Sequence, residues 1–112
     1  MRCYILDNKI TIEIAEKLLD EDIKEVSTIL YKYCHVPLLT CQQVALISFI
    51  FNCGSLAFKN STLLKELNQY RYLKAADEFL RWVHIKGKKL KGLVKRRAIE
   101  RAVFLDEIDI LQ

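Results

Sequence analysis

Three groups of residues in this 112-residue chain are of types that could do chemistry or bind a ligand. The first is Phe51-Asn52-Cys53-Gly54, where a polar amide follows a strongly apolar segment, and the second is the basic stretch from Lys86 to Arg101. The third is Trp82 beside Arg81. An aromatic face can stack on a sugar, and clustered Lys and Arg can bind phosphate or other acidic polymers. Each group also has a plainer interpretation, namely a locally capping Asn, a solvated basic surface and a core Trp.

The cysteines give no sign of a metal or redox site. The chain has four, Cys3, Cys34, Cys41 and Cys53, and no two of them have C-x-x-C spacing. His35 and His84 are far apart in the sequence. We therefore expect no metal and no cofactor, and interpret the cysteines as reduced, mostly buried thiols that act as small apolar residues. A Cys34–Cys41 bridge stays open as an alternative.

Charge and hydropathy bear on partners and location. The net charge of +4 comes from 18 Lys and Arg against 14 Asp and Glu, which is compatible with an acidic polymer as partner but does not require one. No apolar run approaches the ~18–20 residues of a membrane span, and the first residues lack the ~7–15-residue apolar stretch of a signal peptide. We expect no membrane partner and a cytoplasmic chain.

The composition predicts one all-α domain. Hydrophobic residues make up 52% of the chain, which has one Pro and three Gly, too few turn-formers for a many-stranded β fold. Hydrophobic spacing predicts about five helices. They run from a Thr11 cap to before Pro37, from Thr40 to Gly54, from an Asn60 or Ser61 cap to Asn68, from Tyr72 to Trp82 and, after a basic loop over 86–92, from about Leu93 to Leu105. We divide the chain into a short extension (1–10), the domain (11–105) and a tail (106–112).

Local signals predict how some of these elements begin, end and pair. Thr40 with Gln43 three residues on is typical of a capping box. Gly54 can take the left-handed conformation at the end of its helix. Asp77 and Arg81 have the i,i+4 spacing of a helical ion pair.

Taken together, several stretches in the same order resemble the phage-type lysozyme family, endolysins that are muramidases of the glycoside hydrolase class. The resemblance extends from about Thr11 to Leu105. The stretches that carry it are Thr11-x-x-x-Ala15-Glu16-x-Leu18-Leu19-x-x-Asp22, Val36-Pro37-Leu38, Ala45-Leu46-x-Ser48-Phe49-x-Phe51-Asn52-x-Gly54, Ala57-Phe58-x-x-Ser61-Thr62-Leu63-Leu64, Ala75-Ala76-Asp77-Glu78-Phe79, Arg81-Trp82 and Gly92-Leu93-Val94-Lys95-Arg96-Arg97-x-x-Glu100-Arg101.

The resemblance implies catalysis by a Glu on an N-terminal helix and by an Asp and a Thr on the hairpin after it. That segment has no counterpart in this sequence, and Glu13, Glu16 and Asp20 align with the helix that follows it. We therefore expect a truncated homologue of the helical lobe, with no catalytic residues and no muramidase activity, that acts as a binding or regulatory protein or is a prophage remnant. One alternative is an endolysin whose catalytic segment is supplied elsewhere. Another is a basic helical module that binds nucleic acid.

The resemblance also implies what remains of the substrate cleft. Asn52 would face the substrate across the cleft, and Arg96 and Arg97 would be structural. The neighbouring floor would be formed by Phe51, Phe58, Asn60 and Ser61, with Arg81 and Trp82 supporting it.

The expected partners follow from the cleft and from the face of the missing lobe. Because only the helical side of the substrate cleft is expected, it would make fewer contacts, which predicts weak binding of peptidoglycan. An apolar face with Ile47 and Ile50, beneath residues 4–12, predicts a homodimer or a protein partner. Should hydrolysis occur, Glu66 or Glu78 would be the first carboxylates to consider.

Overall fold

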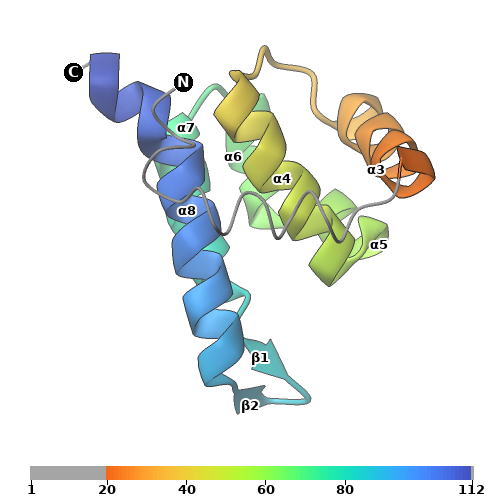
Figure 1. The fold of residues 1–112 in the computed structure, drawn as a ribbon, viewed down its shortest axis with the longest axis vertical. Coiled ribbons are helices and arrows are strands. Elements are labelled where there is room, and N and C mark those ends of the chain that lie inside the picture. The colour runs from red at the N-terminus through yellow and green to blue at the C-terminus, as the bar shows by residue number, and fades with distance from the viewer. Residues whose placement is uncertain (1–19, 112) are drawn as a thin grey trace.

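The computed structural model describes the backbone of residues 20–111 and the side chains of residues 23–106. This part of the chain is mainly helical, which confirms the predicted all-α class (Figure 1). Its elements are α3 (Asp20–Tyr33), α4 (Thr40–Cys53), α5 (Ser55–Lys59), α6 (Thr62–Asn68), α7 (Tyr72–Glu78), the 3-10 helix η1 (Phe79–Arg81), β1 (His84–Ile85), β2 (Lys88–Lys89) and α8 (Lys91–Leu111).

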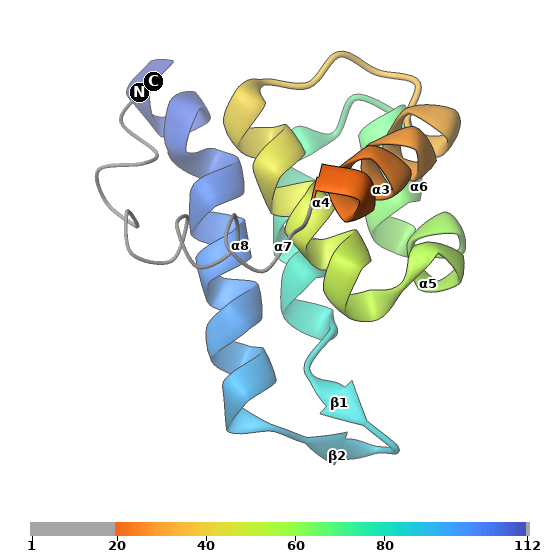
Figure 2. The ribbon, with the colours of Figure 1, turned by 45° about the vertical axis from the view of Figure 1, so that its right-hand side comes forward.

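Helix α4 is the centre of the fold. It packs against α8 on one side and against α3 and α5 on the other, as the two views show (Figures 1 and 2). Its apolar run is buried almost all round, as expected of a central helix. The buried apolar members on this helix are Cys41, Ala45, Leu46, Phe49 and Ile50. The core around it is therefore continuous from α3 to α8.

The start of α4 differs from the predicted capping box by one residue. Thr40 is the first helical residue and is exposed, so Leu39 occupies the cap position. The Leu39 backbone N–H donates to Gln42 Oε1 at 2.8 Å. Gln42, and not Gln43, is therefore the residue that satisfies the cap backbone, because the helix begins one residue earlier than the Thr signal suggested.

Helix α3 lies within the long helix predicted from Thr11, but that cap and the preceding residues are outside the described part. Val26 and Leu30 are buried, in agreement with the predicted apolar stripe. The loop after α3 is held by Asn68, the last residue of α6. Its Oδ1 accepts from the His35 backbone N–H at 2.8 Å, and its Nδ2 donates to the Tyr33 carbonyl at 2.9 Å.

The helix predicted from Tyr72 to Trp82 is divided into α7 and η1. The tighter 3-10 turn places residues three apart on the same side, so Arg81 Nε pairs with Glu78 at 3.5 Å. The predicted Asp77–Arg81 pair is therefore wrong, and Asp77 instead accepts from Arg101 at 2.8 Å. Helix α8 is longer than predicted at both ends and extends through the expected tail.

The basic loop predicted over 86–92 is a short antiparallel hairpin, with His84 opposite Lys89 and Ile85 opposite Lys88. Its two turn residues, Lys86 and Gly87, have φ values of 52° and 78°. Two consecutive positive φ values match the two-residue turn that suits the twist of hairpin strands. At the end of α4, Gly54 also has a positive φ, 96°, but its ψ of 156° lies outside the left-handed helical region that was predicted.

Within the described residues, no helix combines the length and the apolar character that crossing a membrane requires.

Candidate functional site

A pocket beside α6 and η1 brings together four of the seven site residues predicted from the sequence. It has a volume of about 290 Å³. Its lining residues are Asn60, Ser61, Thr62, Glu78, Arg81 and Trp82. The pocket thus presents an amide, hydroxyls, an ion pair and an indole, a combination that can hydrogen-bond a polar ligand and contact its flat apolar side.

Ser61 and Trp82 are fixed by their neighbours in this pocket. Ser61 is the cap of α6, as predicted: its Oγ accepts from the Leu64 N–H at 3.1 Å and donates to the Phe58 carbonyl at 2.7 Å. The half-buried Trp82 meets the Phe49 ring edge to face, with centroids 5.4 Å apart. These two residues are therefore a rigid part of the wall.

Asn60 and Arg81 are the adaptable part of the wall. Both are exposed, and the Arg81 side chain keeps 73% of its accessible surface while it contacts Glu78. Surface ion pairs of this kind contribute little to stability, so the guanidinium can reorient toward a ligand at small cost.

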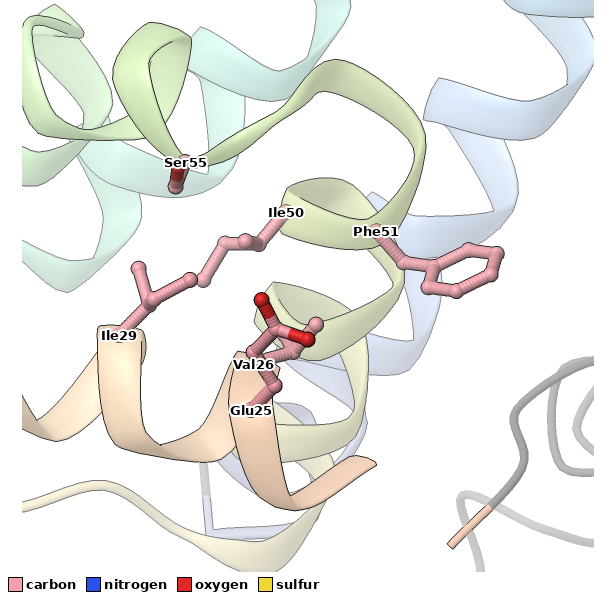
Figure 3. Close-up of a pocket in the computed structure, with 6 residues that line it drawn as sticks. All are labelled: Glu25, Val26, Ile29, Ile50, Phe51 and Ser55. Atoms are coloured by element: carbon pink, nitrogen blue, oxygen red, sulfur yellow. The ribbon is translucent and has the colours of Figure 1, made fainter. Parts of the chain in front are cut away.

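The other three predicted cleft residues lie elsewhere. Phe58 is fully buried and packs edge to face near Phe49, so it belongs to the core and has no surface to offer a ligand. Phe51 is 42% exposed and belongs to a second pocket, of about 220 Å³, between α3 and α4. Figure 3 shows its ring pointing away from Ile29 and Ile50, whose side chains approach each other. Ile50 is only 2% exposed, although we expected it on an open face.

Asn52 is exposed but is held by a buried polar cluster between α4 and α8. Arg97, with none of its surface accessible, donates to Asn52 Oδ1 at 2.5 Å and to Cys53 Sγ at 2.7 Å. Its Nε lies 3.1 Å from Glu100 Oε1. Asn52 is therefore oriented by an arginine of the last helix, which fits the structural role predicted for Arg97.

Glu100 is the acidic centre of this cluster, and it is 1% exposed. Its Oε2 accepts from Ser48 Oγ at 2.5 Å and lies 3.4 Å from Arg96 Nε. Arg96 also donates to Ser48 Oγ at 3.1 Å. The carboxylate is therefore buried between α4 and α8, where it links the two helices and is not presented to a ligand at the surface.

Little in the sequence indicates that Ser48 and Glu100 form a pair. The available signal was weak: Ser48 is the only polar residue within the apolar run over 44–51. A buried hydroxyl needs a partner, and that need could have directed attention to a charged residue on a facing helix.

Burial raises the pKa of Glu100, while Arg97, the Ser48 hydroxyl and Arg96 lower it by a smaller amount. A carboxyl group whose pKa is raised by folding binds its proton more tightly in the folded state. The folded protein should therefore gain stability as the pH falls from neutral toward the ordinary Glu value of 4.5, below which the gain is complete.

Comparison with Glu100→Gln tests this pH dependence, because glutamine keeps the size but cannot titrate. Thermal melting of both proteins from neutral pH down to about pH 4.5 should show the wild type gaining stability relative to the variant. A difference that stays constant would show that the arginines balance the effect of burial on the pKa of Glu100, and a change of the opposite sign would show that they outweigh it.

Burial also raises the pKa of the Cys53 thiol, and the nearby Arg97 charge opposes that effect. The two other cysteines in the described part are buried, and they are not bonded to each other. Cys34 contacts the Val36 carbonyl at 3.9 Å and Cys41 the Phe104 carbonyl at 3.8 Å. Across residues 23–106, no three His, Cys, Asp or Glu side chains gather in a way that could hold a metal ion.

The basic stretch that suggested nucleic-acid binding is only partly a surface. Arg96 and Arg97 face α4, and Arg101 makes two hydrogen bonds with Asp77. The lysines of the hairpin and of the first turns of α8 are exposed. The arginines, which would have given the most specific contacts to nucleic acid, therefore stabilise the fold.

Comparisons with known proteins agree with this fold. The chain is 47% identical over 87 residues to the SAR-endolysin of Escherichia phage Mu, a match that covers 78% of the chain and 51% of that protein. It is 45% identical over 96 residues to the endolysin of Salmonella phage P22, covering 86% of the chain and 65% of the endolysin. The chain thus spans about half the length of the phage Mu protein and two-thirds of the P22 protein.

Solved structures give the same result. A P22 lysozyme mutant superposes with a TM-score of 0.71 at 44% identity, over 76% of this chain and 57% of that one. The muramidase domain of SpmX from Asticaccaulis excentricus superposes with a TM-score of 0.73 at 35% identity, over 81% and 65%. The family model described as phage lysozyme matches residues 4–100, so the chain belongs to the phage lysozyme family.

Proposed function

We propose that this chain binds glycan strands of peptidoglycan through the pocket at α6 and η1 and that, by itself, it does not hydrolyse them. Such a chain would act as a binding or regulatory protein. The proposal combines membership of the phage lysozyme family with the residues that line that pocket. Its substrate class comes from relatives that are called endolysins and a muramidase domain.

The observation that carries the binding part is the mixed lining of the pocket. Asn60 and Arg81 supply exposed hydrogen-bonding groups, and Trp82 supplies an aromatic wall held by the core. Sugars are bound in this way, by polar groups around the ring and by an aromatic surface against it. Because the pocket is small and open to one side of the fold, we expect a dissociation constant on the order of millimolar.

The lack of hydrolysis follows from the carboxylates. An inverting glycosidase uses two carboxyl groups about 6.5–9.5 Å apart, one of them with a raised pKa. Of the residues lining the pocket, Glu78 alone carries a carboxylate, and it pairs with Arg81. Glu100 has a raised pKa but is sealed between α4 and α8. The described residues therefore supply this pocket with one carboxylate where the reaction needs two.

Amide NMR with a muramyl oligosaccharide tests binding. Arg81→Ala should weaken it roughly fivefold, the effect of one hydrogen bond of about 1 kcal/mol. Arg71→Ala is a matched control, because Arg71 is also exposed and contacts an acidic side chain, Glu66, at 3.5 Å. Shift changes confined to Phe51 and Asn52, with equal effects of the two variants, would contradict the placement of the site.

Turbidity of purified peptidoglycan tests hydrolysis separately. The 112-residue chain should leave the turbidity unchanged. A heat-sensitive decrease would contradict the proposal, and its loss in Glu78→Gln or in Glu66→Gln would then identify the acid responsible.

A second candidate function is that of an endolysin whose catalytic segment comes from elsewhere. It is favoured by the match to only 51% of the phage Mu protein, together with the open pocket beside Phe51 that could receive another segment or a second copy of the chain. Mixing the chain with a peptide made from the unmatched part of that endolysin should then restore hydrolysis. Sedimentation of the chain alone tests whether a second copy occupies the pocket beside Phe51. A monomer at tens of micromolar would contradict such a homodimer.

A further inference from the structure

We propose that the β1–β2 hairpin and the first turns of α8 form a surface that binds anionic lipid bilayers. We call this surface the cationic hairpin and define it as residues 84–95. It is distinct from the pocket at α6 and η1, and the inference does not rest on the proposed function. Figures 1 and 2 show the two strands at one end of the molecule, beyond the packed helices.

The charge of the cationic hairpin is concentrated and uncompensated. From Phe79 to Ile99 the sequence has no Asp or Glu. The hairpin carries five exposed lysines, more than the net charge of +4 of the whole chain. In the part of the chain that the structure describes, none of them takes part in an ion pair. They are Lys86, Lys88, Lys89, Lys91 and Lys95.

Large aliphatic side chains are exposed among these lysines. Ile85 is 52% exposed, and Leu90 and Val94 are each 37% exposed. A surface depression of about 510 Å³ is lined by Val94 with three of the lysines. Lysine stems are themselves apolar, so they can extend this apolar surface while each ammonium group reaches outward.

The backbone holds this arrangement in place. The turn at Lys86-Gly87 has the two positive φ values of a tight hairpin, and the Leu90 N–H donates to the Val83 carbonyl at 3.0 Å. Ile85 is directly opposite Lys88, and residues paired in this way have their side chains on the same side of the ribbon. An apolar and a cationic side chain are thus presented together by a rigid element.

This combination favours a lipid surface over nucleic acid. Anionic headgroups attract clustered lysines electrostatically. Aliphatic side chains add binding free energy when they leave water for the boundary between headgroups and acyl chains. A duplex would use the lysines but would leave the exposed Ile, Leu and Val without a partner. The sequence predicted no membrane partner because it has no spanning segment, but a protein that lies on a bilayer needs none.

Cosedimentation with vesicles tests the charge requirement. The chain should bind vesicles of phosphatidylcholine mixed with phosphatidylglycerol and should not bind vesicles of phosphatidylcholine alone. Reversing two charges in Lys88→Glu/Lys89→Glu should weaken binding at least about tenfold. The control Lys65→Glu/Lys74→Glu changes the net charge equally on exposed positions of α6 and α7 and should have little effect.

A second pair of variants tests the apolar requirement. Ile85→Ser should weaken vesicle binding several-fold, whereas Leu73→Ser, on α7 and 55% exposed, should not. Equal effects of the hairpin and control variants, or equal binding to both kinds of vesicle, would overturn the proposal. So would tighter binding of a DNA duplex that displaces the chain from vesicles, which would assign the surface to nucleic acid.

Discussion

Replacing Arg97 with methionine is expected to lower the free energy of unfolding by about 3–5 kcal/mol. Methionine fills a similar space but removes the guanidinium group that contacts Asn52, Cys53 and Glu100. Glu100 would keep Ser48 and Arg96 as partners but would lose its closest buried cation. Breaking a buried ion pair costs this much because the remaining charge is left in a medium that solvates it poorly.

The matched control is Arg101→Met, one turn further along the same helix. Arg101 also pairs with an acidic side chain, but the Arg101 and Asp77 side chains are 38% and 65% exposed. Its loss should cost at most about 1 kcal/mol. Denaturant unfolding of both variants at neutral pH measures the difference. Equal losses would show that the buried cluster contributes no more than a surface pair.

The pH dependence gives the Arg97→Met experiment an internal check. Without Arg97, the opposing effect of its charge on the pKa of Glu100 is lost, and burial acts with less compensation. Protonation of Glu100 then removes a buried charge that has lost its closest cation. The stability difference between Arg97→Met and the wild type should therefore shrink as the pH is lowered from neutral.

Much of the fold could be predicted because its signals are local. The apolar run over 44–51 predicts a buried helix, and Ser61 before Leu63 and Leu64 predicts the start of another. The hairpin was missed because Lys86 adopts a positive φ, which few residues other than glycine adopt often. Nothing in the composition of a lysine-rich segment distinguishes such a turn from an irregular loop.

The candidate site could be predicted only in part, because it depends on how helices pack. The resemblance grouped Asn60 and Ser61 with Arg81 and Trp82, and these four residues line one pocket in the structure. The resemblance could not show that Phe58 belongs to the core. Packing of α4 against α8 brings together residues about fifty positions apart, such as Ser48 and Glu100. The hydrophobic periodicity within a single helix does not indicate which residues of another helix it will contact.

Phe49→Ala should lower the free energy of unfolding by about 3–5 kcal/mol, the usual cost of removing a buried aromatic side chain. The ring of Phe49 has no accessible surface and lies at the junction of α4 with η1 and α8. The Arg97 guanidinium lies 5.4 Å from its centroid. Edge-to-face contacts join it to three further aromatic rings, those of Phe58, Phe79 and Trp82.

Phe51→Ala is the control, since Phe51 lies on the same helix two residues further on and is 42% exposed. Its truncation removes the same atoms from a position that is already partly in water, so we expect a loss of about 0.5 kcal/mol. Trp82 is the only Trp of the chain and touches Phe49, so its fluorescence reports directly on the cavity. The Phe49→Ala variant should shift this emission to longer wavelength, because water gains access to the indole, and Phe51→Ala should leave it unchanged. Equal stability losses without a shift would mean that the wall of the pocket at α6 and η1 does not depend on the core beneath it.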